Sequence, residues 1–172
     1  MIPGLLQTAA YARAVVLAAH PQASDEEVDG KVNARMARAC LFDDDQKTPE
    51  YWVILPELLL RHPILPSKEM TEQLGHIAAL ALRRRIVLQV LPWNSGPYPL
   101  MLGMAKIMTF PDAPPLVYTE SSYSGDTIEE PALVKQYRKS YDRLRAAALP
   151  PEASLPMVEA AAEDNRNGKQ AD

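Results

Sequence analysis

The sequence predicts an α+β fold: a small mixed β-sheet of about four strands covered by helices, with two N-terminal and two C-terminal helices. Amphipathic helical patterns lie at both ends of the chain, and short apolar runs typical of strands lie between them. A helical segment separates the first two strands, which predicts a right-handed crossover between parallel neighbours. A four-residue loop separates the last two strands, which predicts that they pair antiparallel.

Helix caps predict the two N-terminal helices. Thr8 can cap a helix that runs to about Ala19. Ser24, followed three residues later by Glu27, forms a capping box for a second helix. Apolar residues at every fourth position of that helix predict one buried stripe, made of Val28, Val32, Met36 and Cys40. We expect Arg35 and Arg38, which lie off this stripe, to face water or a partner.

The segment before the first helix, Ile2 to Leu6, carries an isoleucine and two leucines beside Pro3. Leaving such side chains wet forfeits ~1.5–3 kcal/mol each. We therefore expect this segment to be buried against the body of the domain.

The strands alternate with a helix in the middle of the chain. "YWVILPEL" is short, β-branched and aromatic, and stops at Pro56. Ser67 is predicted to cap the following helix, whose buried stripe is Met70, Leu74, Ile77, Ala78 and Ala81. "IVLQVLP" is a continuous apolar run, as in a strand covered on both faces. "GMAKIMTF" and "PLVYT" are the last two strands.

The C-terminal part is predicted to be helical. One helix runs from Glu130 to Leu149, with an apolar face made of Leu133, Tyr137, Tyr141, Leu144 and Ala148. A short helix follows from Ser154 to about Ala162. We expect residues 1–163 to form a single ligand- or partner-binding domain and residues 164–172 to form a disordered tail.

Composition narrows the function classes. The net charge of −4 argues against direct DNA binding by this chain, because that affinity needs a concentrated basic surface. The basic run from Arg83 to Arg85 is explained by the negative end of a helix dipole. No apolar run approaches the ~18 residues that span a bilayer, so no membrane association is expected. The single cysteine, Cys40, excludes an internal disulfide and favours a cytoplasmic location.

No complete catalytic motif is present, and no metal or other cofactor is predicted, since the three histidines are scattered. Three polar residues that interrupt strands are candidates for acid–base work or ligand orientation: Glu57, Tyr118 and Glu120. An ion pair with Arg61, four residues on, is the structural alternative for Glu57. Tyr118 and Glu120 share a strand face, where hydrogen bonding to a helix end or an arginine is the alternative.

The longest predicted loop runs from Pro92 to Gly103, after the carboxyl end of a buried strand, where ligands often bind. Trp93 and Tyr98 give this loop aromatic surface. They are candidate ligand-binding residues, together with Ala105, Tyr118 and Glu120. A lid of core aromatics over the sheet edge is the alternative.

Five stretches occur in a familiar order: "IPGLLQTAAYARAVV", "VNARMARACLF", "ILPELLLRHPI", "IVLQVLP" and "LVYTES", before "VKQYRKSYDRLRAAALPPEAS". This series resembles the C-terminal effector domain of actinobacterial Xre-type helix-turn-helix transcriptional regulators, the antitoxin-like group. In that family the first stretch directly follows the DNA-binding domain and its linker. The resemblance covers Ile2 to about Glu163.

Some positions depart from that family. Ile64-Leu65 replaces a Val-Gly step, His62 replaces an arginine, and Ala105 replaces an aromatic residue of a core strand. Lost aromatic volume at Ala105 predicts a cavity near Tyr118 and the loop from Pro92.

The resemblance implies a regulatory domain, without its DNA-reading half, that binds a small molecule or a protein partner. Two alternatives stay open. A stand-alone relative recruited as a small tailoring enzyme, a cyclase or isomerase, would use a pocket in the same fold. A purely structural domain would form a homodimer.

Overall fold

The computed structural model describes residues 1–43, 48–98, 100–101, 103–121 and 124–168. Within them, the α+β class is confirmed. The strands form two sheets, a parallel pair and a three-stranded antiparallel sheet, where the sequence predicted one mixed sheet of about four strands. The chain divides into two compact units: Met1–Trp93 with Leu149–Asp172, and Asn94–Ala148.

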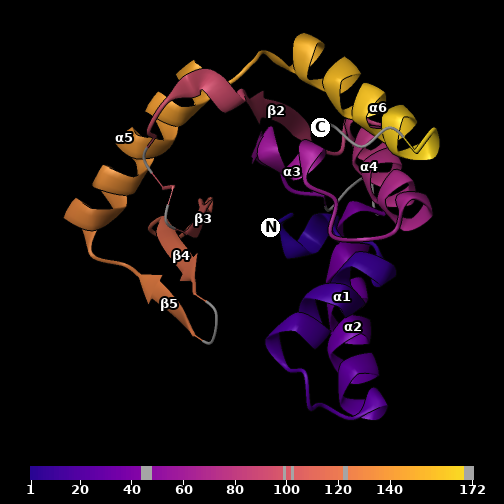
Figure 1. The fold of residues 1–172 in the computed structure, drawn as a ribbon. Helices are drawn as coiled ribbons and strands as arrows, with labels where there is room; N and C mark the ends of the chain where they lie inside the picture. Colours follow the sequence, from indigo (N-terminus) through magenta and orange to yellow (C-terminus); the bar gives the residue numbers. More distant parts are fainter. Residues whose placement is uncertain (44–47, 99, 102, 122–123, 169–172) are drawn as a thin grey trace. The chain divides into compact units, whose positions relative to one another are not determined.

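The parallel pair of the first unit consists of β1 (Trp52–Pro56) and β2 (Val87–Leu91), with Trp52 opposite Val87. Helix α4 (Ser67–Leu82) connects them, as the sequence predicted. Figure 1 shows α4 beside α6 (Pro151–Arg166), and both helices contribute to the main hydrophobic core with β1 and β2. The predicted apolar stripe of α4 is confirmed, with Met70, Leu74 and Ile77 fully buried.

The cap predicted for α4 is wrong. The N-cap residue is Pro66, which offers no side-chain acceptor, and Ser67 is the first residue of the helix. The Ser67 carbonyl instead accepts a hydrogen bond from the Thr71 hydroxyl, at 2.7 Å.

The returning chain covers the outer edge of β2. The Leu149 N–H donates to the Val90 carbonyl at 2.8 Å, and the Val90 N–H donates to the buried Ser154 hydroxyl at 2.9 Å. The Gln89 side-chain amide donates from Nε2 to the Leu149 carbonyl at 2.9 Å. These bonds attach α6 to the sheet through its first turn. The helix extends beyond the predicted Ser154–Ala162 span to Arg166, so it includes the first residues of the predicted tail.

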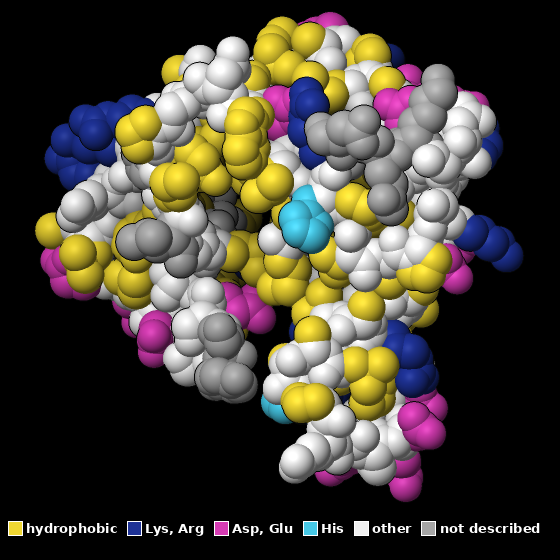
Figure 2. Space-filling view, in the orientation of Figure 1, with side chains coloured by type: hydrophobic (Ala, Val, Ile, Leu, Met, Phe, Trp, Pro, Cys, Tyr) yellow, Lys and Arg dark blue, Asp and Glu magenta, His cyan; other side chains and the backbone are white. Residues whose placement is uncertain are grey.

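The predicted N-terminal helices are confirmed as α1 (Ala9–Ala19) and α2 (Asp25–Ala39). Thr8 caps α1, and the capping box at Ser24 is complete. The two helices form a hairpin with a small core of its own, made of Ala12, Val16, Val28 and Val32. In Figure 2, acidic and basic side chains appear on this hairpin beside hydrophobic ones.

The predicted burial of Cys40 is wrong. Helix α2 ends at Ala39, and Cys40 begins the 3-10 turn η2 (Cys40–Phe42). The tighter winding of that turn takes Cys40 off the apolar stripe and leaves it exposed, while Phe42 enters the main core.

The N-terminal segment is buried, as predicted. It contains the 3-10 turn η1 (Gly4–Leu6), and Ile2 and Leu6 are fully buried in the main core. Gln73 of α4 holds its backbone: the side-chain amide donates to the Leu6 carbonyl at 2.7 Å and accepts from the Thr8 N–H at 2.8 Å.

The second unit contains β3 (Met104–Met108), β4 (Leu116–Glu120), β5 (Gly125–Ile128) and α5 (Pro131–Ala147). The β3–β4 pair is antiparallel, as predicted, and β5 adds an unpredicted third strand. Helix α5 packs on β3 and β4. Leu133 is 45% exposed, against prediction, and the adjacent Val134 is buried instead.

Candidate functional site

Glu57 lies at the carboxyl end of β1 and joins the ends of both parallel strands. Its N–H donates to the Leu91 carbonyl of β2 at 2.9 Å. Its side chain is 8% exposed. One carboxylate oxygen accepts from Nε of Arg61 at 2.6 Å, and the other accepts from the Trp93 N–H at 2.7 Å. The local ion pair with Arg61 that the sequence suggested is therefore present.

These contacts define the electrostatics of Glu57. The hydrogen bond from the Trp93 N–H lowers the pKa of the carboxyl most, burial opposes it, and Arg61 lowers it further. The group is therefore a fixed carboxylate at neutral pH. Because both oxygens hold partners, the arrangement suits positioning better than proton transfer, which favours a raised pKa in a carboxyl group.

The two residues that Glu57 contacts, Arg61 and Trp93, both have exposed side chains. Arg61 ends the short helix α3 (Leu58–Arg61), and its side chain is 59% exposed. Trp93 begins the 3-10 turn η3 (Trp93–Ser95) and is 68% exposed. The exposed side chain of Leu58 follows Glu57 directly. Tryptophan and arginine are among the residue types most enriched in the binding hot spots of protein interfaces.

The structure brings together two of the candidate residues, Glu57 and Trp93, in the first unit. They lie where the sequence predicted a site, beyond the carboxyl ends of parallel strands. We call Glu57, Leu58, Arg61 and Trp93 the strand-end site.

The other candidates belong to the second unit. Tyr118 and Glu120 share one face of β4, because they lie two residues apart on the strand. Lys106 and Met104 of β3 lie opposite them. The Lys106 ammonium lies 5.4 Å from the centre of the Tyr118 ring, within cation–π range. Tyr118 and Glu120 are both half-buried.

Ala105 lies on the opposite face from Tyr118, since it is paired with Thr119. The two residues therefore cannot line one cavity from the same sheet face, as the predicted pocket requires. Ala105 is half-buried, as is Tyr98.

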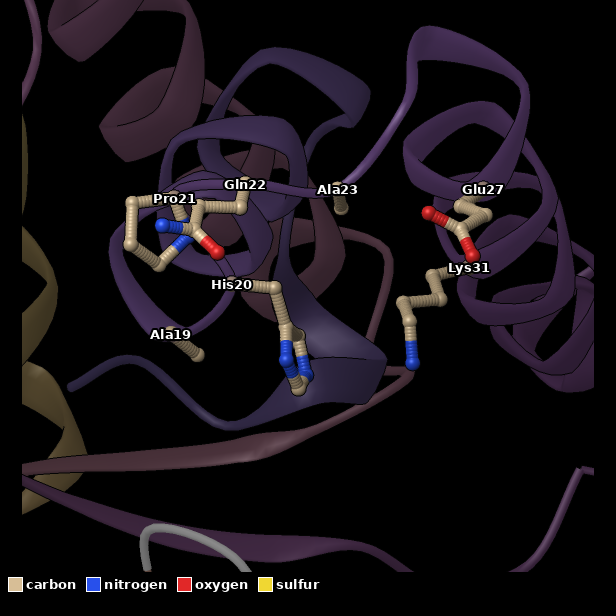
Figure 3. Close-up of a pocket in the computed structure, with 7 residues that line it drawn as sticks. All are labelled: Ala19, His20, Pro21, Gln22, Ala23, Glu27 and Lys31. Carbon is tan, nitrogen blue, oxygen red and sulfur yellow. The ribbon is translucent and has the colours of Figure 1, made fainter.

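A hollow of about 430 Å³ lies at the turn between α1 and α2, and none of its lining residues is a candidate from the sequence. In Figure 3, His20 extends from the turn and Lys31 extends from α2 toward the same space. Most of the lining side chains are exposed, so a bound molecule would stay largely wet, unlike most ligands in protein pockets. The lining is Ala19, His20, Pro21, Gln22, Ala23, Glu27 and Lys31.

Two general features bear on the site. Among the described residues, no three or more His, Cys, Asp and Glu side chains gather as metal ligands. Over the same part of the chain, no helix combines the length and apolarity needed to cross a membrane.

Two buried glutamines, Gln7 and Gln73, were not predicted from the sequence. Gln7 and Gln73 are at most 1% exposed, and each carboxamide bonds to backbone groups of the N-terminal segment. Gln73 carried a usable signal: it sits three residues after Met70, on the apolar stripe of α4. A glutamine at such a position is stable only with buried partners.

The fold and the site define an α+β protein that displays an aromatic and a basic side chain at the carboxyl ends of a parallel strand pair. The chain belongs to the family described as a domain of unknown function, DUF5753, whose model matches residues 1–160. No curated protein and no solved structure matches the chain.

Proposed function

We propose that this chain is the regulatory domain of an Xre-type transcription regulator. It binds a protein partner through the strand-end site and controls an attached or separate helix-turn-helix domain. The observation that carries the proposal is that the buried Glu57 carboxylate fixes the backbone of Trp93 and the guanidinium of Arg61. Because this backbone segment and this guanidinium are already held in place, they lose less entropy when a partner binds.

The exposure of the site favours a protein over a small molecule. A small ligand is usually enclosed on most of its surface, whereas Trp93 is 68% exposed. A tryptophan of this kind becomes an anchor when it inserts into a partner's pocket, and truncating such an anchor costs ≥2 kcal/mol of binding energy, or roughly 30-fold in affinity.

The alternative as a tailoring enzyme receives less support from this site. A general acid or base needs an oxygen available to the substrate, and both Glu57 oxygens hold protein donors. The proposal does not include direct DNA binding by this chain. Its net charge is −4, and DNA binding needs a concentrated basic surface that neutralises phosphates.

A two-hybrid screen of the host's own proteins tests the proposal, with the wild type and Trp93→Ala as baits. Trp52→Ala is the matched control: Trp52 lies at the opposite end of the strand pair, is 38% exposed, and bonds Glu50 through its indole. We expect a partner that binds the wild type and the control and loses roughly 30-fold in affinity with Trp93→Ala. Circular dichroism melting confirms that each bait is folded.

The regulatory half of the proposal needs its own readout. Co-expression of the chain with an Xre-type helix-turn-helix regulator should change transcription from a reporter promoter, and Trp93→Ala should abolish that change. Partners that bind Trp93→Ala as tightly as the wild type, or a reporter that ignores the chain, would contradict the proposal.

A further inference from the structure

Two separate hydrophobic cores meet at the N-terminal segment. The main core contains Ile2, Leu6 and Tyr11, while the hairpin core begins at the next residue of α1, Ala12. Helix α2 also contacts η1 directly. The hairpin is therefore a substructure with its own packing, and the N-terminal segment lies where it joins the main body.

A chain of hydrogen bonds crosses this junction. Arg35 of α2 donates from Nη1 to the Gln7 side-chain oxygen at 2.8 Å. The Gln7 side-chain nitrogen donates to the Ile2 carbonyl at 2.8 Å. The Ile2 N–H in turn donates to the Tyr11 hydroxyl at 3.3 Å. These hydrogen bonds connect Arg35 of α2 to Ile2 of the main core, and Ile2 to Tyr11 of α1.

The carboxamide of Gln7 is a rigid plane with oxygen on one side and nitrogen on the other. Because Arg35 can donate but not accept, its contact requires the oxygen to face α2, which turns the nitrogen toward Ile2. Gln7 is 1% exposed, so its oxygen has little water to replace a lost guanidinium.

The backbone on both sides of Gln7 is held independently. Gln73 bonds the Leu6 carbonyl and the Thr8 N–H, so α4 fixes the peptide groups that flank Gln7. The orientation of the Gln7 side chain depends on α2, while its backbone depends on α4. Arg35 can therefore act on Ile2 without moving the rest of the segment.

We propose that the Arg35–Gln7 contact couples the α1–α2 hairpin to the N-terminal segment. Any displacement of α2 that withdraws Arg35 leaves the buried Gln7 oxygen without this donor and weakens the hold of its nitrogen on Ile2. The position of the hairpin then sets how tightly Ile2 is held. This device is independent of the strand-end site and of the function proposed for it.

Amide hydrogen exchange of the full chain tests this coupling. Arg35→Met keeps the length of the side chain and removes its donors. We expect exchange at the Ile2 amide to rise about tenfold, the factor that corresponds to one net hydrogen bond of ~1.4 kcal/mol. Leu88 and Val90 of β2 serve as internal reference, and their exchange should not change. Arg38→Met, at an exposed position of the same helix, is the matched control and should leave residues 2–7 unchanged.

A second variant approaches the contact from the other side. Gln7→Met should raise exchange at Ile2 as Arg35→Met does, and the double variant should add little, because both changes break one relay. Unchanged exchange in both single variants would overturn the proposal. So would a uniform rise that includes β2, because it would mean global destabilisation instead of a local link.

Discussion

The ring of Tyr118 in β4 lies over the backbone of Gly125 in β5. A Cβ added at Gly125 would overlap the phenol oxygen and the adjoining ring carbons of Tyr118. Gly125 begins an edge strand, where a glycine leaves the backbone uncovered, and a cross-strand aromatic ring can cover it. The glycine is required here by a close approach, because the ring occupies the place of a side chain.

Gly125→Ala should therefore destabilise the second unit. Adding a methyl group to a filled position costs ~1–3 kcal/mol, more than the conformational entropy that alanine saves. The measurement is amide exchange of β4, which reports on this unit directly. Gly75→Ala is the control: nothing lies within 4 Å of a Cβ built there, so in helix α4 it should be neutral or stabilising.

Tyr118→Ala combined with Gly125→Ala separates overlap from other effects. Removing the ring makes room for the new methyl group, so the alanine should cost less in the double variant than in the wild-type background. Equal costs in both backgrounds would mean that the close approach does not determine the stability of β5.

Gln73→Leu should strongly destabilise the first unit, even though leucine suits the apolar stripe of α4. The change leaves the Leu6 carbonyl and the Thr8 N–H without their partner, at roughly 1–3 kcal/mol for each buried group. Urea unfolding measures the loss, with Gln22→Leu at an exposed position as the control. A loss of less than about 0.5 kcal/mol, as at ordinary surface positions, would show that water replaces both bonds.

Local signals made most helices and the parallel pair predictable. The caps at Thr8 and Ser24 depend on a few neighbouring residues, and a helix between two apolar runs implies a crossover. The predicted burial of Cys40 and of Leu133 was wrong for a similar reason. Each residue was placed on an apolar face by extending a regular helical period past a point where the winding or the phase of the helix changes. Strand β5 is short and mostly polar, so no apolar alternation marks it.

The candidate site was only partly predictable. Glu57 and Trp93 were each named from the sequence, but their contact joins residues 36 positions apart and depends on the parallel register. Ala105 and Tyr118 were assigned to one cavity, although pairing with Thr119 places Ala105 on the other face. Alternation along one strand is visible in a sequence, whereas the register between strands is not.

Arg84→Gly should stabilise the first unit. Arg84 follows helix α4 with a φ of 56°, in the left-handed region that costs non-glycine residues roughly 1 kcal/mol or more. Its N–H bonds the Ala81 carbonyl and the next N–H bonds the Leu80 carbonyl, both at 2.9 Å, which is the Schellman motif. Glycine suits that position, so we expect a gain of about 0.5–1 kcal/mol.

The melting temperature measures this gain, at roughly 2–4 °C per kcal/mol for a chain of this size. Arg83→Gly is the matched control, because Arg83 has a φ of −77° and gains nothing from glycine. Equal melting temperatures for Arg84→Gly and the wild type would mean that the arginine side chain contributes as much as its conformation costs.

The ionised state of Glu57 should appear in the pH dependence of stability. Its pKa in the folded protein is lowered by the Trp93 N–H first and by Arg61. A carboxyl group of this kind stabilises the fold above its unfolded pKa, about 4.3 for glutamate, and that contribution disappears as the pH falls through the lower folded value.

Glu57→Gln keeps an acceptor for Trp93 but removes the charge. The free energy of unfolding should therefore fall most below wild type at pH 7, and the difference should shrink toward pH 3. Urea unfolding across this range measures it, with Glu159→Gln at an exposed position of α6 as the control that should follow the wild-type curve. A difference between Glu57→Gln and wild type that stays constant from pH 7 to pH 3 would mean that the carboxylate charge does not hold the strand-end site together.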